Sequence, residues 1–324
     1  MKINDLTWLL PQQQLLQRAR AGGRFPGALL IHEDAGAGGA QLARFGASLR
    51  LCREPNAPCG VCRDCRAVER SQHPDLHWIE PIEDSKLIRV EQIRELGEEM
   101  ALTSHGGQAT VAVIRPAEAM NANAANALLK TLEEPRPGVT LVLVTTAPSR
   151  LPATIRSRCQ RLRAASPNRA QCVTWLQAQR GEGDWDALLE LIGNAPLLAL
   201  DLDPAAAARL RLETVEALSQ ARAGQLDIPA AAARWAKDEA FELRLASIEN
   251  WLTTRIERWA GGERQSRELR SSAHLRNNAS DMNIATLLRL LESIYELRRL
   301  ALTAINRTLA LEQLLWQFVA VAAQ

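Results

Sequence analysis

The first half of the chain alternates short apolar runs with longer stretches of helical spacing. Four apolar runs predict buried strands, at residues 28–31, 76–80, 110–114 and 140–146. Between them, apolar residues three and four positions apart predict helices, at residues 41–51, 90–102 and 121–134. Because strands that alternate with helices form parallel sheets covered on both faces, we expect an α/β domain.

The pattern changes after about residue 164, where the strands stop. Residues 168–179 and 184–192 predict two short helices. Beyond Pro204 the chain is rich in Ala, Leu and Arg with helical spacing, apart from a polar stretch at residues 261–280 that predicts a loop. We therefore expect an α/β domain, a small helical domain and an all-α domain, at residues 1–164, 165–204 and 205–324.

Two apolar faces support the all-α prediction. On each face, large apolar residues recur every three or four positions: Leu245, Ile248, Leu252, Ile256 and Trp259 on one, and Leu287, Leu290, Leu291, Ile294 and Leu297 on the other. The tryptophans Trp175, Trp251 and Trp316 also fall at helical spacing, so we expect them in the core rather than exposed as base-stacking groups.

The frame of a phosphate-binding loop follows the first strand. This glycine loop, residues 33–40, contains Gly36 and Gly38, which free the backbone before the next helix. In the working form, G-x-x-x-x-G-K-[ST], the lysine reaches the β/γ-phosphates and the hydroxyl holds Mg²⁺. Those two positions hold Gly39 and Ala40 here. The loop therefore predicts the fold without the side chains that hold ATP.

The first position of the glycine loop is also changed. Glu33 replaces the first glycine, and together with Asp34 it places negative charge at a helix N-terminus that otherwise attracts phosphate. A tight turn without ligand and weak anion binding by backbone N–H groups are both open interpretations.

Four cysteines are closely spaced, in the pattern C-x6-C-x2-C-x2-C: Cys52, Cys59, Cys62 and Cys65. Four thiolates can surround one tetrahedral Zn²⁺, and four protein ligands leave no open position for a reactive water, so we expect a structural zinc site. Two disulfides, an iron–sulfur site and four unlinked thiols are the alternatives. Cys159 and Cys172 stand apart and are expected as buried apolar residues.

Composition narrows the class of protein. With 324 residues, 47% hydrophobic and 23% charged, the chain is globular and long enough for two or three domains. Its net charge of +2 is too small to predict nucleic-acid binding by itself. We find no apolar run of about 18 residues and no signal-peptide core, and therefore expect a cytoplasmic protein without membrane contact.

Two further motifs flank the last predicted strand. N-A-L-L-K-T-L-E-E-P occupies residues 126–135, and L-P-A-T-I-R-S-R-C occupies residues 151–159. Where a nucleoside triphosphatase places an acidic pair after its strand, this chain has Arg115 and Pro116, and Glu118 comes too late, as expected for a solvent-facing helix start. By pattern alone the motifs are an amphipathic helix and a surface arginine.

Together, these two motifs and the cysteines inserted after the loop helix closely resemble the AAA+ subunits of the bacterial clamp loader. Loss of the loop lysine and of the acidic pair resembles the members of this family that do not hydrolyse ATP. The resemblance implies an AAA+ parallel-sheet domain with a zinc module at residues 52–65, a helical lid and a C-terminal collar. Residues 306–315 resemble the final collar helix.

The resemblance also implies roles for single residues. Arg158 matches the arginine finger of the S-R-C motif, which projects into the ATP site of a neighbouring subunit, where its guanidinium can neutralise phosphoryl charge. Thr146 falls near the sensor-1 position, and Leu197 stands where the sensor-2 arginine would touch phosphate. The resemblance thus implies that three contacts to ATP are absent: the loop lysine, the acidic pair and the sensor-2 arginine. Arg158, the side chain that would act on a neighbour, is present.

The function implied is that of a non-hydrolysing stator subunit of DNA polymerase III. It would complete the ATP site of a gamma/tau subunit, brace the delta subunit, and help load the sliding clamp on primed DNA within the assembled ring. One alternative is an active gamma/tau-like ATPase, which predicts hydrolysis by the isolated chain. Another is a zinc-dependent DNA-binding module, against which the near-neutral charge argues.

Overall fold

The computed structural model describes residues 5–82, 85–100, 109–265, 284–300 and 306–322. The chain divides into two compact units. Unit 1 comprises Met1–Thr174 with Asn194–Leu198, and unit 2 comprises Trp175–Gly193 with Ala199–Gln324. The division into three domains at residues 164 and 204 stays a prediction.

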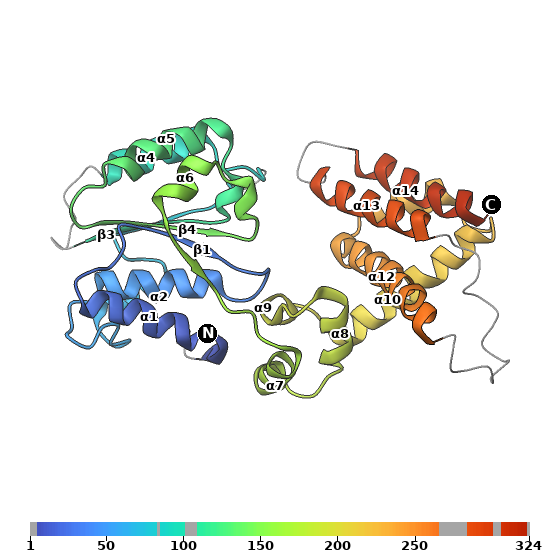
Figure 1. Ribbon diagram of the computed structural model, residues 1–324, viewed down its shortest axis with the longest axis horizontal. Helices are drawn as coiled ribbons and strands as arrows, with labels where there is room; N and C mark the ends of the chain where they lie inside the picture. The colour runs from blue at the N-terminus through green and yellow to red at the C-terminus, as the bar shows by residue number, and fades with distance from the viewer. Residues whose placement is uncertain (1–4, 83–84, 101–108, 266–283, 301–305, 323–324) are drawn as a thin grey trace. The chain divides into compact units, whose positions relative to one another are not determined.

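A parallel sheet of five strands forms the centre of unit 1 (Figure 1). The strand order is β2-β3-β4-β1-β5, so β1 lies between β4 and β5. The strands are β1 (Ala28–His32), β2 (Leu76–Ile79), β3 (Thr110–Ile114), β4 (Val139–Thr145) and β5 (Gln160–Arg163). The four predicted strands are confirmed within one residue at each end. The edge strand β5 was not predicted, because only Leu162 of its four residues is buried.

Helices cover both faces of the sheet, as the alternating pattern predicted (Figure 1). One face carries α1 (Leu10–Ala21) and α2 (Gly39–Leu51), and the other carries α4 (Val90–Glu99), α5 (Ala122–Glu133) and α6 (Ala153–Arg158). The central strands β3 and β4 are buried along their whole length. Their continuous apolar runs follow from this burial on both faces.

The helix α5 shows how local sequence sets an element that carries a motif. The side chain of Asn121 caps its first turn by accepting a hydrogen bond from the backbone N–H of Ala124 at 2.8 Å. Leu128 and Leu132 then point into the core, and Pro135 follows the end of the helix. The N-A-L-L-K-T-L-E-E-P motif therefore supplies the second part of α5, whose last residue is Glu133.

Shorter elements complete unit 1: η2 (Thr7–Leu9), α3 (Arg63–Glu69), η3 (Ala117–Ala119) and η4 (Pro148–Arg150). Two helices cross the division between the units, α7 (Arg169–Arg180) and α9 (Pro196–Ala199).

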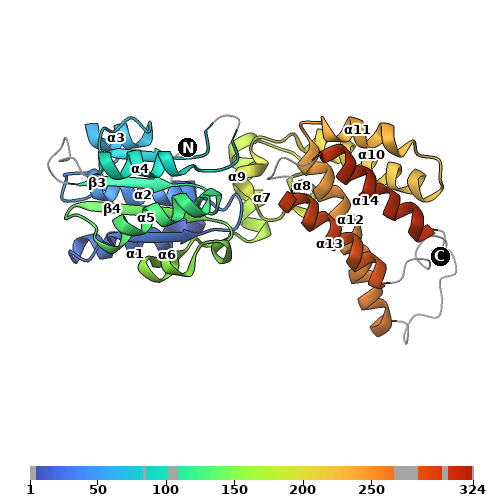
Figure 2. The same cartoon turned by 90° about the horizontal axis from the view of Figure 1, so that it is seen from above.

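The regular elements among the described residues of unit 2 are all helices, joined by short turns (Figure 2). Its helices are α8 (Trp185–Ile192), α10 (Pro204–Arg222), α11 (Ile228–Ala236), α12 (Phe241–Gln265), α13 (Ile284–Leu300) and α14 (Arg307–Ala322). A single apolar core joins α10 to α14 and contains Trp235 and Phe318. None of the helices in the described ranges is long and apolar enough to cross a membrane.

The two predicted apolar faces of unit 2 contribute to this core. Their described members are buried or packed against it, whereas the side chain of Trp259 lies outside the described residues. Two predictions are wrong. Residues 261–265 belong to α12 rather than to a loop, and the remainder of that predicted loop lies largely outside the described residues. Trp316 is 51% exposed, because it lies on the outer side of α14, while Trp175 and Trp251 are buried as expected.

Candidate functional site

The glycine loop connects the end of β1 to the start of α2, where parallel sheets of this kind bind ligands. Gly36 and Gly38 adopt φ angles of +71° and +106°, which L side chains rarely adopt. These angles turn the chain back toward β1. Consequently the first amides of α2 face the first residue of the loop.

Glu33 fills the space inside the glycine loop. One oxygen of its carboxyl group, Oε2, accepts hydrogen bonds from the backbone N–H groups of Gly38 at 3.1 Å and Gly39 at 2.5 Å. Its side chain is buried, with 5% of the residue exposed. In a working loop these backbone N–H groups face phosphate. Here they bind a carboxyl group of the same chain.

Burial raises the pKa of Glu33 above its usual range. The hydrogen bond from Gly39, the charge of Arg115 and the hydrogen bond from Gly38 oppose this shift, and the nearby charge of Glu118 adds to it. Desolvation is the dominant cause because the carboxyl group is enclosed by the loop.

Apolar side chains close the glycine loop. The indole N–H of Trp8 donates to the carbonyl of Ala37 at 2.8 Å, and both groups are buried. A Cβ atom placed on Gly38 would lie 2.9 Å from Leu9, and one placed on Gly36 would lie 2.9 Å from Leu198. Leu197, at the predicted sensor-2 position, donates its backbone N–H to the carbonyl of Gly36 at 3.2 Å.

Polar groups at the ends of β3 and β4 are engaged with one another. Glu118 accepts hydrogen bonds from the backbone N–H of Thr146 at 3.0 Å and from its hydroxyl at 2.7 Å. The half-buried carboxyl group has a lowered pKa, because hydrogen bonds from Thr145 and Thr146 outweigh the effect of burial. Glu118 is therefore not the solvent-facing helix start that the sequence predicted. Its carboxylate accepts the hydrogen bond of the Thr146 hydroxyl, the side chain near the predicted sensor-1 position.

Arg158 ends the short helix α6 on the surface of unit 1. Its guanidinium lies 2.8 Å from a carboxylate oxygen of Glu133 on α5 and donates to the carbonyl of Thr154 at 3.1 Å. The two charged side chains are 36% and 51% exposed. The arginine is thus presented to solvent and held by a contact that water weakens.

The four predicted metal ligands come together between α2 and α3. Their Sγ atoms all lie within 4.8 Å of one another, with Cys52 and Cys62 at 3.9 Å and Cys59 and Cys65 at 4.0 Å. Four sulfurs at 2.3 Å from a tetrahedral Zn²⁺ would lie about 3.8 Å apart. These separations are too long for disulfides, whose sulfurs lie about 2.05 Å apart. The cysteines therefore fit a single metal ion.

Backbone amides support this arrangement of thiols. The Sγ of Cys59 accepts from the N–H of Cys62, and the Sγ of Cys62 accepts from the N–H of Cys65, both at 3.3 Å. Hydrogen bonds from the amides of Val61 and Cys62 lower the pKa of Cys59 to about 7, whereas burial raises that of Cys65. Cys159 and Cys172 are buried elsewhere, as predicted, and burial raises the pKa of each to about 11.

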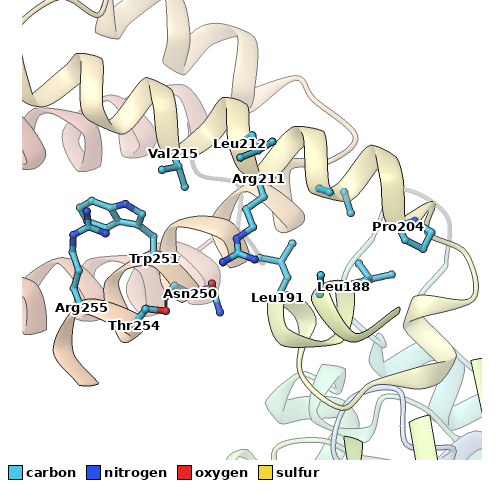
Figure 3. A pocket seen from close by; sticks show the side chains of 13 residues that line it. Leu188, Leu191, Pro204, Arg211, Leu212, Val215, Asn250, Trp251, Thr254 and Arg255 are labelled. Atoms are coloured by element: carbon cyan, nitrogen blue, oxygen red, sulfur yellow. Dashed lines mark hydrogen bonds between the residues drawn. The ribbon is translucent and has the colours of Figure 1, made fainter. Parts of the chain in front are cut away.

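Unit 2 contains a pocket of about 460 Å³ between α8, α10 and α12 (Figure 3). Its walls are mainly apolar, and its cations are already engaged. Arg255 stacks on the ring of Trp251 at 3.4 Å, and Arg211 lies 3.8 Å from Glu190. None of the site residues predicted from the sequence lines this pocket.

The strand order, the glycine loop at the end of β1 and the helix that follows define unit 1 as a domain of the P-loop nucleotide-binding class. A family model described as DNA polymerase III, delta subunit, matches residues 11–168. The chain belongs to the family of DNA polymerase III delta-prime subunits, which are clamp-loader subunits.

Individual relatives support this assignment. The chain is 37% identical over 234 residues to DNA polymerase III subunit delta' of Pseudomonas aeruginosa, covering 70% of this chain and 71% of that protein. It is 37% identical over 139 residues to subunit tau of Escherichia coli, covering 42% and 21%. A gamma subunit-related protein of Thermotoga maritima has the same fold, with a TM-score of 0.51, 18% identity and coverage of 96% and 99%.

Sequence reasoning missed three contacts of the predicted site residues. It gave no direction for the side chain of Glu33, no pairing of Glu118 with Thr146, and no pairing of Arg158 with Glu133. The glycine at position 39 was the available signal for the first, since it leaves the space that Glu33 occupies.

Proposed function

We propose that this chain is the non-hydrolysing stator subunit of a clamp loader, and that Arg158 acts in trans on ATP bound by a neighbouring gamma/tau subunit. The observation that carries the proposal is the contrast between two charged groups. Glu33 is buried inside the chain's own glycine loop, whereas Arg158 is exposed at the end of α6.

Several features together argue against hydrolysis at the chain's own loop. Gly39 and Ala40 supply neither the cation nor the hydroxyl that hold phosphate and Mg²⁺. The carboxyl group of Glu33 occupies the loop amides that would bind phosphate. Thr146 donates its hydroxyl to Glu118, and Leu197 has no charge.

The surroundings of Arg158 suit a side chain that must leave its own chain's carboxylate and bind phosphate on another subunit. A planar guanidinium can bind phosphate oxygens bidentately and stabilise the charge that develops during phosphoryl transfer. Its ion pair with Glu133 is exposed, and pairs of this kind contribute about 0–1 kcal/mol. Releasing the arginine from Glu133 therefore costs little compared with the electrostatic gain at a phosphoryl group.

The four clustered cysteines would hold one Zn²⁺ as a structural ion. All four positions of the tetrahedron would be filled by thiolates, which leaves no site for water or substrate. Cys52 follows the last residue of α2 and Cys62 precedes the first residue of α3. A bound ion would thus join the two helices and the turn between them.

The partners follow from the proposed role. The chain would contact gamma/tau and delta subunits, and reach the sliding clamp and primed DNA through the assembled complex in the cytoplasm. Its net charge of +2 gives no strong attraction for DNA by the isolated chain. DNA contact would then depend on the ring as a whole.

The test is reconstitution with gamma/tau and delta subunits using wild type, Arg158→Ala and, as matched control, Arg161→Ala. Arg161 is an exposed arginine on β5, three residues away. We expect all three complexes to assemble, and DNA-stimulated ATPase and clamp loading to fall only with Arg158→Ala. ATPase that is unchanged in that variant removes the proposed role of Arg158.

The alternative, an active gamma/tau-like ATPase, is favoured by the similarity to subunit tau. It predicts ATP turnover by the isolated chain that is lost when the glycine loop is changed. We expect no turnover above that of a chain with Ala40→Asp, which adds charge to the same loop. Turnover sensitive to this change would contradict the proposal.

A further inference from the structure

The amides at the start of α2 bind a carboxyl group where this class of loop binds phosphate. The N–H groups of Gly38 and Gly39 are buried and both point at Oε2 of Glu33. Buried N–H groups need an acceptor, and those at a helix N-terminus favour an anion. We propose that Glu33 is an internal ligand of the glycine loop, replacing the phosphate that other loops take from solution.

Gly39 supplies the space for this ligand. A Cβ atom at position 39 would lie 2.6 Å from Cδ of Glu33 and 2.9 Å from each carboxylate oxygen. Gly36 and Gly38 have positive φ angles, but Gly39 is the first residue of α2 and is not among the glycines with positive φ. The backbone therefore does not require glycine there. The position is kept small because Glu33 occupies the adjoining space.

Glu33 and Gly39 thus form a coupled pair. In a working loop, the first position is glycine and the seventh is lysine, so the lysine side chain and the phosphate fill the space inside the loop. Here that space is filled from the first position by the side chain of Glu33, and the seventh position, Gly39, has no side chain. A longer side chain at position 39 and the carboxyl group of Glu33 exclude each other.

The enclosure of the loop keeps this ligand in place. Trp8 binds the carbonyl of Ala37, and Leu6 and Leu9 lie against the loop at Gly38. On the other side, Leu198 lies against Gly36. A dissolved anion would therefore have to displace Glu33 from the loop amides.

This inference deepens the silent-site part of the proposed function but does not depend on Arg158 acting in trans. The contact is tested in the isolated chain by melting temperature, with wild type, Gly39→Ala, Glu33→Ala and the double variant. We expect Gly39→Ala to lower the Tm by about 5 °C, because the added Cβ displaces the carboxyl group from the loop amides. The same change should cost little when Glu33 is already Ala.

Gly97→Ala is the matched control, because Gly97 lies within α4 and a Cβ there meets no heavy atom within 4 Å. It should keep or raise the Tm, since Ala favours helices. An unchanged Tm for Gly39→Ala, or an equal loss with and without Glu33, would overturn the inference. The Gly39→Ala result is decisive even where Glu33→Ala does not fold.

The anion chemistry is tested with inorganic phosphate as the probe, against chloride at equal ionic strength. Phosphate should raise the Tm of Glu33→Ala, whose loop amides lack a ligand, and leave wild type and Glu33→Gln unchanged, because both retain a side chain in the loop. A response by wild type equal to that of Glu33→Ala, or no response by Glu33→Ala, contradicts an internal ligand. Failure here leaves the ATPase test of Arg158 unaffected, so the two proposals fail separately.

Discussion

Glu33 and Arg158 are charged side chains in opposite surroundings. Glu33 is buried and binds two backbone amides of its own chain, whereas Arg158 is exposed beside a single carboxylate. A buried charge is fixed by the groups that satisfy it, and an exposed one exchanges partners at little cost. This difference is why we assign Glu33 to the chain's own loop and Arg158 to a neighbour.

The raised pKa of Glu33 predicts a dependence of stability on pH. Since the folded chain keeps this proton to higher pH than the unfolded chain, it binds more protons in a window that begins near pH 4.5 and ends at the raised pKa. The contribution of Glu33 to stability is therefore lost as pH rises through the window. Glu33→Gln has no such proton, so urea unfolding should show the wild type losing stability relative to it. A difference that does not vary with pH would refute the shift.

The ion pair of Arg158 predicts a small effect for Glu133→Gln. The pair is exposed, so removing its negative charge should change the free energy of unfolding by less than about 1 kcal/mol. Reconstituted complexes should still hydrolyse ATP, because Arg158 retains its charge. Glu134→Gln, at the next position, is the control. Loss of ATPase as large as that of Arg158→Ala would mean that Glu133 itself takes part.

For single residues, the sequence predicts which side chains are absent from the glycine loop more reliably than it predicts where the side chains that are present point. The absence of lysine and hydroxyl at Gly39 and Ala40 follows directly from the loop pattern. The direction of Glu33 does not, because it depends on the folded loop, which brings the amides of Gly38 and Gly39 and the space beside Gly39 to its carboxyl group. The four cysteines could be grouped from spacing alone, since they are close in sequence.

Among the elements, the turn between α2 and α3 carries the candidate metal site. Cys52 directly follows the last residue of α2, and the Sγ of Cys62 caps α3 by accepting a hydrogen bond from the N–H of Cys65. Burial and two amide hydrogen bonds thus hold the thiols close together. The residues between Cys52 and Cys62 have little apolar packing, and several of them are exposed. We therefore predict that the segment needs a bound ion for its order.

Removal of one ligand tests this dependence. Cys62→Ser should reduce the zinc content from about one ion per chain to a small fraction and lower the Tm by several degrees. Cys172→Ser, which changes a buried thiol outside the cluster, should keep the zinc. Metal analysis by mass spectrometry after purification makes the comparison. Equal zinc in both variants would exclude the cluster as the metal site.

Element prediction succeeded where burial is strong and failed where it is weak. The strand β3 has the predicted bounds because all five residues are buried and the four that follow Thr110 are apolar. The edge strand β5 was missed since three of its four residues are exposed and charged or polar. The end of α12 was missed because two glycines and polar residues at 261–265 resemble a loop, although they continue the helix.

Across the whole molecule, two units of different construction share one chain. Unit 1 has the sheet, the glycine loop, the cysteines and Arg158, and unit 2 is an all-α unit with a core of its own. The chain belongs to the delta-prime family, and its glycine loop has Gly39 and Ala40 where a working loop has lysine and a hydroxyl residue. In the proposed role, the sheet would position Arg158 toward ATP on a neighbouring subunit, and the chain would need no phosphate site of its own.

The proposed completion of an adjacent subunit's ATP site by Arg158 can be measured as a single-turnover burst of ATP hydrolysis. In the reconstituted complex, Arg158→Ala should lower the burst amplitude by the share of one site, since an arginine finger contributes about 10³–10⁵ in rate, while ATP binding and assembly persist. Arg161→Ala should leave the amplitude intact. A burst of full amplitude and rate with Arg158→Ala would contradict the proposed role of Arg158.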